Sequence, residues 1–169
     1  MENTKDKNIA FIDSQNLNLG ARELGWKIDY RKFRVYLREK YDVEKAYMFI
    51  GFVALNQSLY DNLQESGFIL RFKPTIPDFD GKIKGNVDAD MVLSAMIERN
   101  DYDKAVIVSN DGDFYSLVEH LYINNKLEVV LSTNRKFCSS LLAQSAKEKI
   151  QYVDDLREKI EYTKKKSTA

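Results

Sequence analysis

Cysteine and histidine are nearly absent from this chain of 169 residues, which has one of each, Cys138 and His120. A single cysteine excludes a disulfide framework within the chain and a cysteine-rich zinc site. A single histidine argues against a histidine zinc site and against a catalytic triad that needs an imidazole, because His120 would have to supply it. The catalytic chemistry that remains is that of carboxylates.

An excess of charge of one sign is also lacking. The chain has 26 Lys and Arg residues and 26 Asp and Glu residues, so its formal net charge is +0. Neutrality argues against wholesale coating of DNA, although it allows a local basic patch. No apolar run approaches the roughly 20 residues that span a membrane, and the short run 9–12 does not form a signal peptide. We therefore expect a cytoplasmic protein without a membrane partner, in which Cys138 stays reduced.

What the sequence does contain is an alternation of strand-like and helix-like patterns. Apolar runs predict strands at 9–12, 46–52, 68–72, 105–108 and 127–131, with a short sixth at 150–153. Helical spacing is found at 30–41, 55–63, 89–99, 114–123, 139–147 and 154–162, the last with Asp154 or Asp155 as N-cap. The stretch 75–86, rich in turn residues and charges, is expected to be a loop.

This alternation predicts an α/β fold, a three-layer sandwich of Rossmann-like type with a mostly parallel sheet of five to six strands. There is no repeat of fixed period and no low-complexity linker. We therefore expect one domain over residues 1–169, with a core at about 8–153. A C-terminal helix and a lysine-rich tail would follow over 154–169.

Acidic residues stand where two predicted strands end and where one helix begins. Asp13 follows the first strand, Asp111 and Asp113 follow the fourth, and Asp88 precedes the helix at 89–99. In open parallel sheets, ligands bind beyond the carboxyl ends of the strands, where the strand order reverses. In the common doubly wound order the first and fourth strands are neighbours there. We therefore expect Asp13 beside Asp111 and Asp113.

Crowded carboxylates repel one another unless a proton, a Lys or Arg side chain or a cation neutralises them. Oxygen ligands without His or Cys suit Mg²⁺ or Mn²⁺, ions that assist phosphoryl displacement. A structural alternative exists, because Asp is a common helix N-cap and Asp-Gly a common turn. Taken singly, each acid is more often structural. Asp13 is harder to explain that way, since an acid directly after a buried strand is costly unless paired or ligated.

Three segments, in order, resemble the motifs of NYN domains, relatives of PIN-like nucleases that include LabA-like proteins. Residues 11–17 (FIDSQNL) resemble the opening F-I-D-G-x-N-L. Residues 84–93 (KGNVDADMVL) resemble K-G-V-D-x-x-L with one inserted residue, and residues 108–118 (VSNDGDFYSLV) resemble S-G-D-x-D-F-x-P-L-V. The resemblance covers about residues 8–153 and implies a PIN-like fold.

The resemblance implies a metal-dependent ribonuclease that hydrolyses RNA phosphodiesters with Mg²⁺ or Mn²⁺. The catalytic and metal-binding carboxylates would be Asp13, Asp88, Asp111 and Asp113. We expect substrate contacts from Asn16 and Ser109, which match motif positions, and from basic residues near the predicted site. These basic candidates are Lys84, Arg135 and Lys136, together with Arg71, Lys73 and Lys82, and Lys84 is preferred because it precedes Asp88 by four residues.

The chain departs from the family pattern at three positions. Ser14 and Asn110 replace glycines, and we expect Asn110 to preserve a left-handed turn. Ser94 replaces an acid found in many relatives, and Asp90, one helical turn earlier, could substitute as a metal ligand.

These departures leave open an alternative, a catalytically weak or inactive RNA-binding or regulatory module. A small-molecule phosphatase is a further alternative, although no D-x-D pair follows the first strand. The oligomeric state is also open, with a homodimer as one option.

Overall fold

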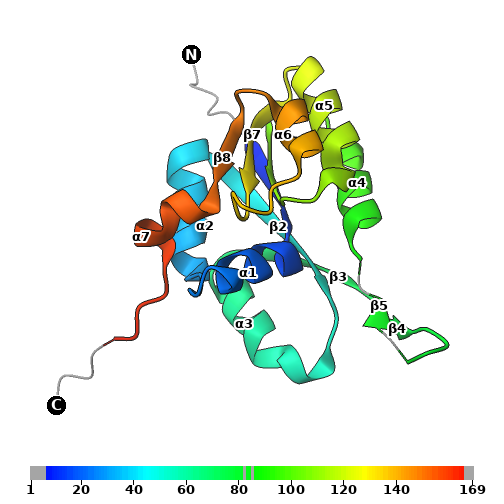
Figure 1. Cartoon of the computed structure of the whole chain (residues 1–169), viewed down its shortest axis with the longest axis vertical. Coiled ribbons are helices and arrows are strands. Elements are labelled where there is room, and N and C mark those ends of the chain that lie inside the picture. Colours follow the sequence, from blue (N-terminus) through cyan, green and yellow to red (C-terminus); the bar gives the residue numbers. More distant parts are fainter. Residues whose placement is uncertain (1–6, 82, 85, 166–169) are drawn as a thin grey trace.

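A six-stranded sheet forms the centre of the computed structural model, which describes residues 7–81, 83–84 and 86–165 (Figure 1). The strand order is β3-β2-β1-β6-β7-β8, and all five pairings are parallel. This confirms the predicted α/β class and the sheet of five to six strands. The strands are β1 (Asn8–Asp13), β2 (Val43–Gly51), β3 (Ile69–Lys73), β6 (Ala105–Val108), β7 (Leu127–Ser132) and β8 (Ile150–Tyr152).

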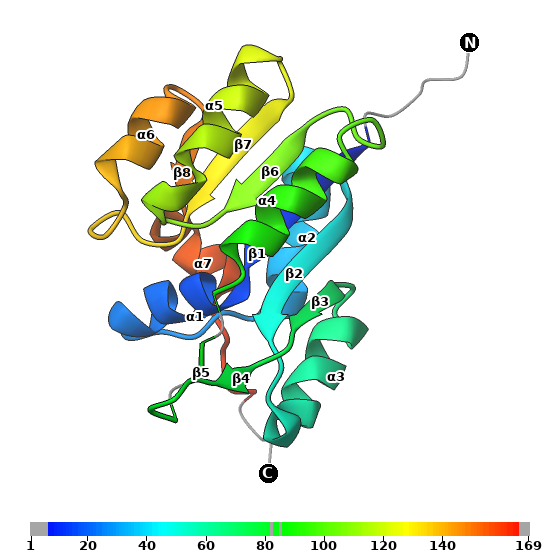
Figure 2. The same cartoon turned by 90° about the vertical axis from the view of Figure 1, so that its right-hand side faces the viewer.

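Helices cover both faces of this sheet (Figure 2). Buried residues of α1, α2, α3 and α7 pack on one face, and those of α4, α5 and α6 pack on the other. No helix among the described residues is long and apolar enough to cross a membrane. The helices are α1 (Ser14–Glu23), α2 (Tyr30–Tyr41), α3 (Gln57–Glu65), α4 (Asp88–Ile97), α5 (Tyr115–Ile123), α6 (Ser140–Ala146) and α7 (Arg157–Ile160).

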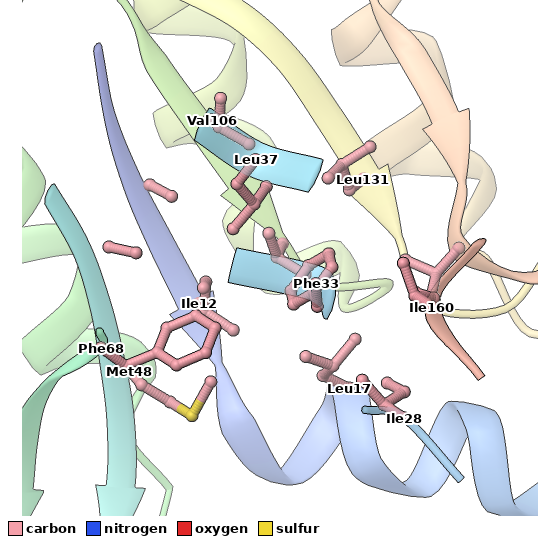
Figure 3. Close-up of a cluster of buried hydrophobic side chains, with 14 of the residues drawn as sticks. Ile12, Leu17, Ile28, Phe33, Leu37, Met48, Phe68, Val106, Leu131 and Ile160 are labelled. Carbon is pink, nitrogen blue, oxygen red and sulfur yellow. The ribbon is translucent and has the colours of Figure 1, made fainter. Parts of the chain in front are cut away.

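The middle of strand β1, residues 9–12, is entirely apolar because both faces of the strand are covered. Ala10 and Ile12 point into the core on the side of α2, whereas Ile9 and Phe11 point into the core on the side of α4. Successive side chains of a strand face opposite sides, so polar residues are left for the two ends of β1, Asn8 and Asp13. Figure 3 shows Ile12 in the first of these cores, with Phe33 of α2 nearby. Burial on both faces holds the central strands in place, so the positions of their carboxyl ends relative to one another are defined.

Three elements differ from the sequence prediction. Helix α1 was not expected, because it buries only Ser14, Leu17, Gly20 and Ala21 and so has a weak apolar pattern. The predicted loop at 75–86 contains a short antiparallel hairpin of β4 (Ile76–Pro77) and β5 (Ile83–Lys84).

The predicted helix at 154–162 is shorter than expected, and neither Asp154 nor Asp155 caps α7. A 3₁₀ turn, η3 (Val153–Leu156), precedes α7. After α7, Glu161 forms an antiparallel bridge with Ile28, and the Tyr162 amide donates to the Lys27 carbonyl at 2.8 Å. These backbone bonds hold the segment after Ile160 extended, so the helix cannot continue.

Candidate functional site

The carboxyl ends of β1 and β6 lie side by side, as the doubly wound strand order requires. The two strands pair in parallel with Ile12 opposite Val108, so Asp13 and Ser109 follow at the same edge of the sheet. Asp111 lies two residues beyond Ser109 and precedes a 3₁₀ turn, η2 (Gly112–Phe114). Two segments almost a hundred residues apart in sequence thus contribute acids to one place.

Helix α4 supplies the third acidic segment. One carboxylate oxygen from each of Asp88, Asp111 and Asp113 lies within 4.8 Å of the other two. Asp13 is close enough for its carboxylate to be affected by the charges of Asp88 and Asp111. The acids border a pocket of about 280 Å³. Its lining residues are Asp13, Gln15, Asn16, Leu19, Asn86, Val87, Asp88 and Asp111.

Asp13 is the most buried of these acids, with 6% of its surface exposed. Its Oδ1 accepts from the Asn16 amide at 3.2 Å as the N-cap of α1, and its Oδ2 accepts from the Ser109 hydroxyl at 3.5 Å. Burial raises the pKa of Asp13 to about 6, and the charges of Asp88 and Asp111 add to this rise. A negative charge at Asp13 is therefore unfavourable unless a cation or a proton offsets it.

Asp88 has an oxygen without a partner. Its Oδ2 is buried and accepts no hydrogen bond from any described residue. Burial raises the pKa of Asp88, and Asp111 and Asp113 raise it further, whereas the Asn86 side chain and Lys73 lower it. Buried polar atoms are normally hydrogen-bonded, so an unpaired carboxylate oxygen among other carboxylates needs an explanation. A bound cation would give one, and the oxygen-only donor set fits Mg²⁺ or Mn²⁺.

Hydrogen bonds from backbone amides at helix starts explain the positions of only some of the carboxylate oxygens in the acidic group. The amide of Asn16 occupies Oδ1 of Asp13, and the amide of Asp113 donates to Oδ1 of Asp111 at 2.9 Å. Within the residues that the structure describes, none of the four acids forms an ion pair with Lys, Arg or His. Among the described residues, the structural alternative explains one oxygen in each of two acids, and Lys73 offsets only part of the charge of Asp88.

A network of side chains fastens the loops that carry the acids. The Asn16 side-chain amide donates to Oδ1 of Asn110 at 2.5 Å, and its Oδ1 accepts from the Asn110 amide and the Thr133 hydroxyl at 2.9 and 2.8 Å. Ser109, fully buried, accepts from the Asp111 amide at 3.1 Å. The ends of β1, β6 and β7 are joined in this way. Substrate contact by Asn16 and Ser109 stays a prediction.

Neither departure from the family glycines requires a left-handed backbone. The described non-glycine residues with positive φ are Asp42, Asn125 and Lys147, so Asn110 and Ser14 are not among them. The expectation of a left-handed turn at Asn110 is therefore wrong. Asn110 instead exchanges two hydrogen bonds with Asn16, an interaction that a glycine could make only through its backbone.

The proposed substitute ligand, Asp90, lies outside the group formed by Asp88, Asp111 and Asp113. It is exposed, and its carboxylate is 3.5 Å from the Lys73 ammonium. Lys73 also donates to the Asn86 carbonyl, so it ties β3 to the segment that precedes Asp88. Lys73 and Ser94 lie in a neighbouring pocket that shares Val87 with the acidic pocket.

The basic residues proposed as substrate contacts differ in what surrounds their side chains. Arg135 is 2.5 Å from the Asp155 carboxylate and stacks 3.9 Å above the Tyr152 ring. Lys136 is exposed, with its ammonium 5.2 Å from the Phe137 ring. Lys84 belongs to β5, but its side chain and all of Lys82 lie outside the described residues. Their contacts with substrate remain predictions.

Asn86 and Thr133 are two residues at the site that no sequence pattern indicated. Asn86 is the residue inserted into the K-G-V-D motif, and its side chain accepts from the Asp88 amide at 2.8 Å. Thr133 follows β7, so the rule that sites form beyond strand ends could have identified it.

Comparison with known proteins agrees with this arrangement. A family model of the NYN domain matches residues 8–153. The chain belongs to the NYN domain family. Within this NYN chain, all three motif segments contribute side chains to the acidic group or its pocket. NYN domains are members of the PIN-like nuclease superfamily, so an acidic group at this edge is in keeping with the family.

Two individual proteins are similar over nearly their full lengths. The low amplitude and bright protein LabA of Synechococcus elongatus is 26% identical over 166 residues, covering 92% of this chain and 88% of LabA. A crystal structure of a protein of unknown function from Vibrio parahaemolyticus superposes with a TM-score of 0.80. It is 26% identical, and the match covers 96% of this chain and 100% of that one. The structural match agrees with the predicted fold.

Proposed function

We propose that this NYN domain is a metal-dependent endoribonuclease that hydrolyses RNA phosphodiesters in the acidic pocket. The observation that carries the proposal is the buried, unpartnered Oδ2 of Asp88, which belongs to a group of three carboxylates. Such a group is unfavourable as a purely structural feature, because every carboxylate raises the cost of ionising its neighbours. Family membership supports the same activity.

The residues that would hold Mg²⁺ or Mn²⁺ are Asp13, Asp88, Asp111 and Asp113. When bound, a divalent ion supplies an activated water and offsets negative charge on the oxygens around phosphorus. The chain's own contribution is to hold the acids in place: Asn16 and Ser109 fix the loops after β1 and β6, and Lys73 fixes the segment before α4. Asp90 could join the ligands only by leaving Lys73.

RNA is the proposed substrate and partner, and Lys84, Arg135 and Lys136 are the proposed phosphate contacts. Basic side chains position a nucleic acid backbone without reading its sequence. The ion pair of Arg135 with Asp155 is more than half exposed on both sides, and such pairs contribute little, so a phosphate could displace Asp155. We also propose that the chain is a homodimer. Action in the cytoplasm stays a prediction.

The activity is tested by incubating a fluorescent RNA with Mn²⁺ and measuring cleavage by wild type, Asp88→Asn and Glu161→Gln. Glu161 is the matched control, because it is an acid paired with Arg157, and neither residue belongs to the acidic pocket or to the proposed phosphate contacts. We expect Asp88→Asn to lower the rate about 100-fold or more and Glu161→Gln to retain it. Equal rates for all three proteins would contradict the proposal.

One observation favours the alternative of an RNA-binding module without cleavage. Asp90, the acid one helical turn before Ser94, is paired with Lys73 and lies outside the acidic group. The same experiment separates the two functions when RNA binding is followed by fluorescence anisotropy. Binding by wild type with no Mn²⁺-dependent product would establish the module and overturn the nuclease.

A further inference from the structure

Exposed apolar side chains gather at one end of the molecule. Eight of the 16 large apolar side chains that are exposed in the described part of the chain lie between Phe52 and Phe79. Residues 51–60 contain no charged residue, whereas 31% of the whole chain is charged. We call the following set the apolar end: Phe52, Val53, Leu55, Leu59, Phe72 and Ile76.

The apolar end is built from ordered contacts. The Thr75 hydroxyl donates to the Phe52 carbonyl at 2.8 Å, and the Val53 amide donates to the Tyr60 hydroxyl at 2.8 Å. The ring centroids of Phe52 and Phe72 are 5.9 and 4.8 Å from that of the buried Tyr60. Leu55 and Ile76, which are 93% and 73% exposed, lie in segments anchored by these contacts. The surface therefore presents apolar groups in a fixed arrangement.

The composition of the apolar end fits a protein interface. Interface cores are depleted of charge and enriched in aromatic residues, and large exposed apolar patches mark interaction sites. An RNA backbone is a poor occupant, because binding it requires basic groups that residues 51–60 lack, and the two basic residues of 69–79, Arg71 and Lys73, are paired with Glu98 and Asp90.

We propose that the apolar end binds a second copy of this chain in a two-fold dimer. A two-fold contact places the same patch on both sides, so like charges on it would face one another. Residues 51–60 carry no charge, and the basic residues next to Phe72, Arg71 and Lys73, are paired with Glu98 and Asp90, so the apolar end is compatible with a second copy of itself. A different protein would normally be selected by complementary charge, which this segment does not offer.

The proposed interface adjoins the acidic pocket. Val53 and Leu59 line a pocket of about 400 Å³ that shares Gln15 with the acidic pocket. A second copy on the apolar end would therefore lie beside the entrance to the candidate site. The proposal does not depend on the proposed nuclease activity, since it rests on composition and exposure alone.

The test is the mass of the full chain in solution, measured by light scattering and analytical ultracentrifugation in EDTA without RNA. Leu55→Glu places a charge on the patch at a nearly fully exposed position, so the fold is not disturbed. Ile123→Glu is the matched control, because Ile123 is 73% exposed at the end of α5, remote from α3 and β3 in both views (Figures 1 and 2).

We expect wild type and Ile123→Glu to have twice the mass of one chain at micromolar concentration. Leu55→Glu should weaken self-association about 30- to 100-fold and give monomers. A monomeric wild type, or dimers lost in Ile123→Glu and kept in Leu55→Glu, would overturn the proposal. So would a monomeric wild type whose affinity for a single-stranded RNA falls in Leu55→Glu, because the patch would then contact bases.

Discussion

The acids of this protein fall into two groups that differ in what surrounds them. Outside the acidic pocket, Asp155, Glu161 and Glu128 each have a basic partner, at 2.5, 3.0 and 3.6 Å respectively. Inside it, Asp13 and Asp88 have raised pKa values, because burial and neighbouring carboxylates disfavour their charge. The chain has equal numbers of acidic and basic residues, so the difference lies in where the charges are placed.

A partner supplied by the chain, more than acidity itself, therefore distinguishes the paired surface carboxylates from those of the candidate site. A structural acid lowers its energy through a partner supplied by the chain. The acids of the pocket make the metal-free protein less stable, and that cost is accounted for if a cation binds there. Substitutions in either group of acids, and changes of pH, test whether the two groups differ in this way.

The largest expected effect comes from Asp13→Asn. Asparagine keeps the acceptor for the Asn16 amide and removes the buried charge. Because the pKa of Asp13 is raised to about 6, the substitution should stabilise the metal-free protein at pH 7 by about 3 kcal/mol. Urea unfolding in EDTA measures this gain. A loss of stability in Asp13→Asn would mean that the charge is already compensated.

The stability of the metal-free protein should also depend on pH in a direction that the charge of Asp13 determines. In the unfolded chain the pKa of Asp13 is near 3.8, and in the folded protein it is about 6. The folded state therefore holds more protons between these values, and the contribution of Asp13 to stability falls as the pH rises from about 4 to 6. The stability of wild type relative to Asp13→Asn should decline over that interval. A difference that stays constant from pH 4 to 7 would contradict the raised pKa.

Substituting an acid that already has a basic partner should change the stability least. Glu161→Gln removes a partly exposed acid that is bound to Arg157 at 3.0 Å at the surface. Exposed ion pairs are screened by solvent and contribute little. The urea midpoint at pH 7 should therefore stay within experimental error of wild type, with or without Mn²⁺. A clear shift with Mn²⁺ would place an ion-sensitive acid outside the pocket.

Much of the fold was predictable because buried elements have characteristic patterns of apolar residues in the sequence. The run at 105–108 is apolar at every position because β6 is covered on both faces, and the parallel sheet follows from the alternation of strands and helices. Helix α1 was not predictable in the same way. It buries only Ser14, Leu17, Gly20 and Ala21, and Gly20 approaches Thr133 so closely that an added Cβ would lie 2.9 Å from the Thr133 carbonyl.

The place of the acidic group in the fold was predictable from the sequence. The hydrogen bonds and ion pairs around it were not. That β1 and β6 are neighbours follows from strand order, which brings Asp13 near Asp111. The pairing of Asp90 with Lys73, and the bond of Thr133 to Asn16, depend on how β3, α4 and β7 pack. Such contacts join segments far apart in sequence, so no local pattern records them.

The most direct test of the account is a calorimetric titration of the metal-free protein with Mn²⁺ at pH 7, repeated on Asp88→Asn and on Glu161→Gln. We expect saturable binding to wild type and to Glu161→Gln, and an affinity about 10- to 100-fold lower for Asp88→Asn. Equal affinity in all three proteins, or no binding to wild type, would contradict the claim that the uncompensated carboxylates form a divalent-cation site.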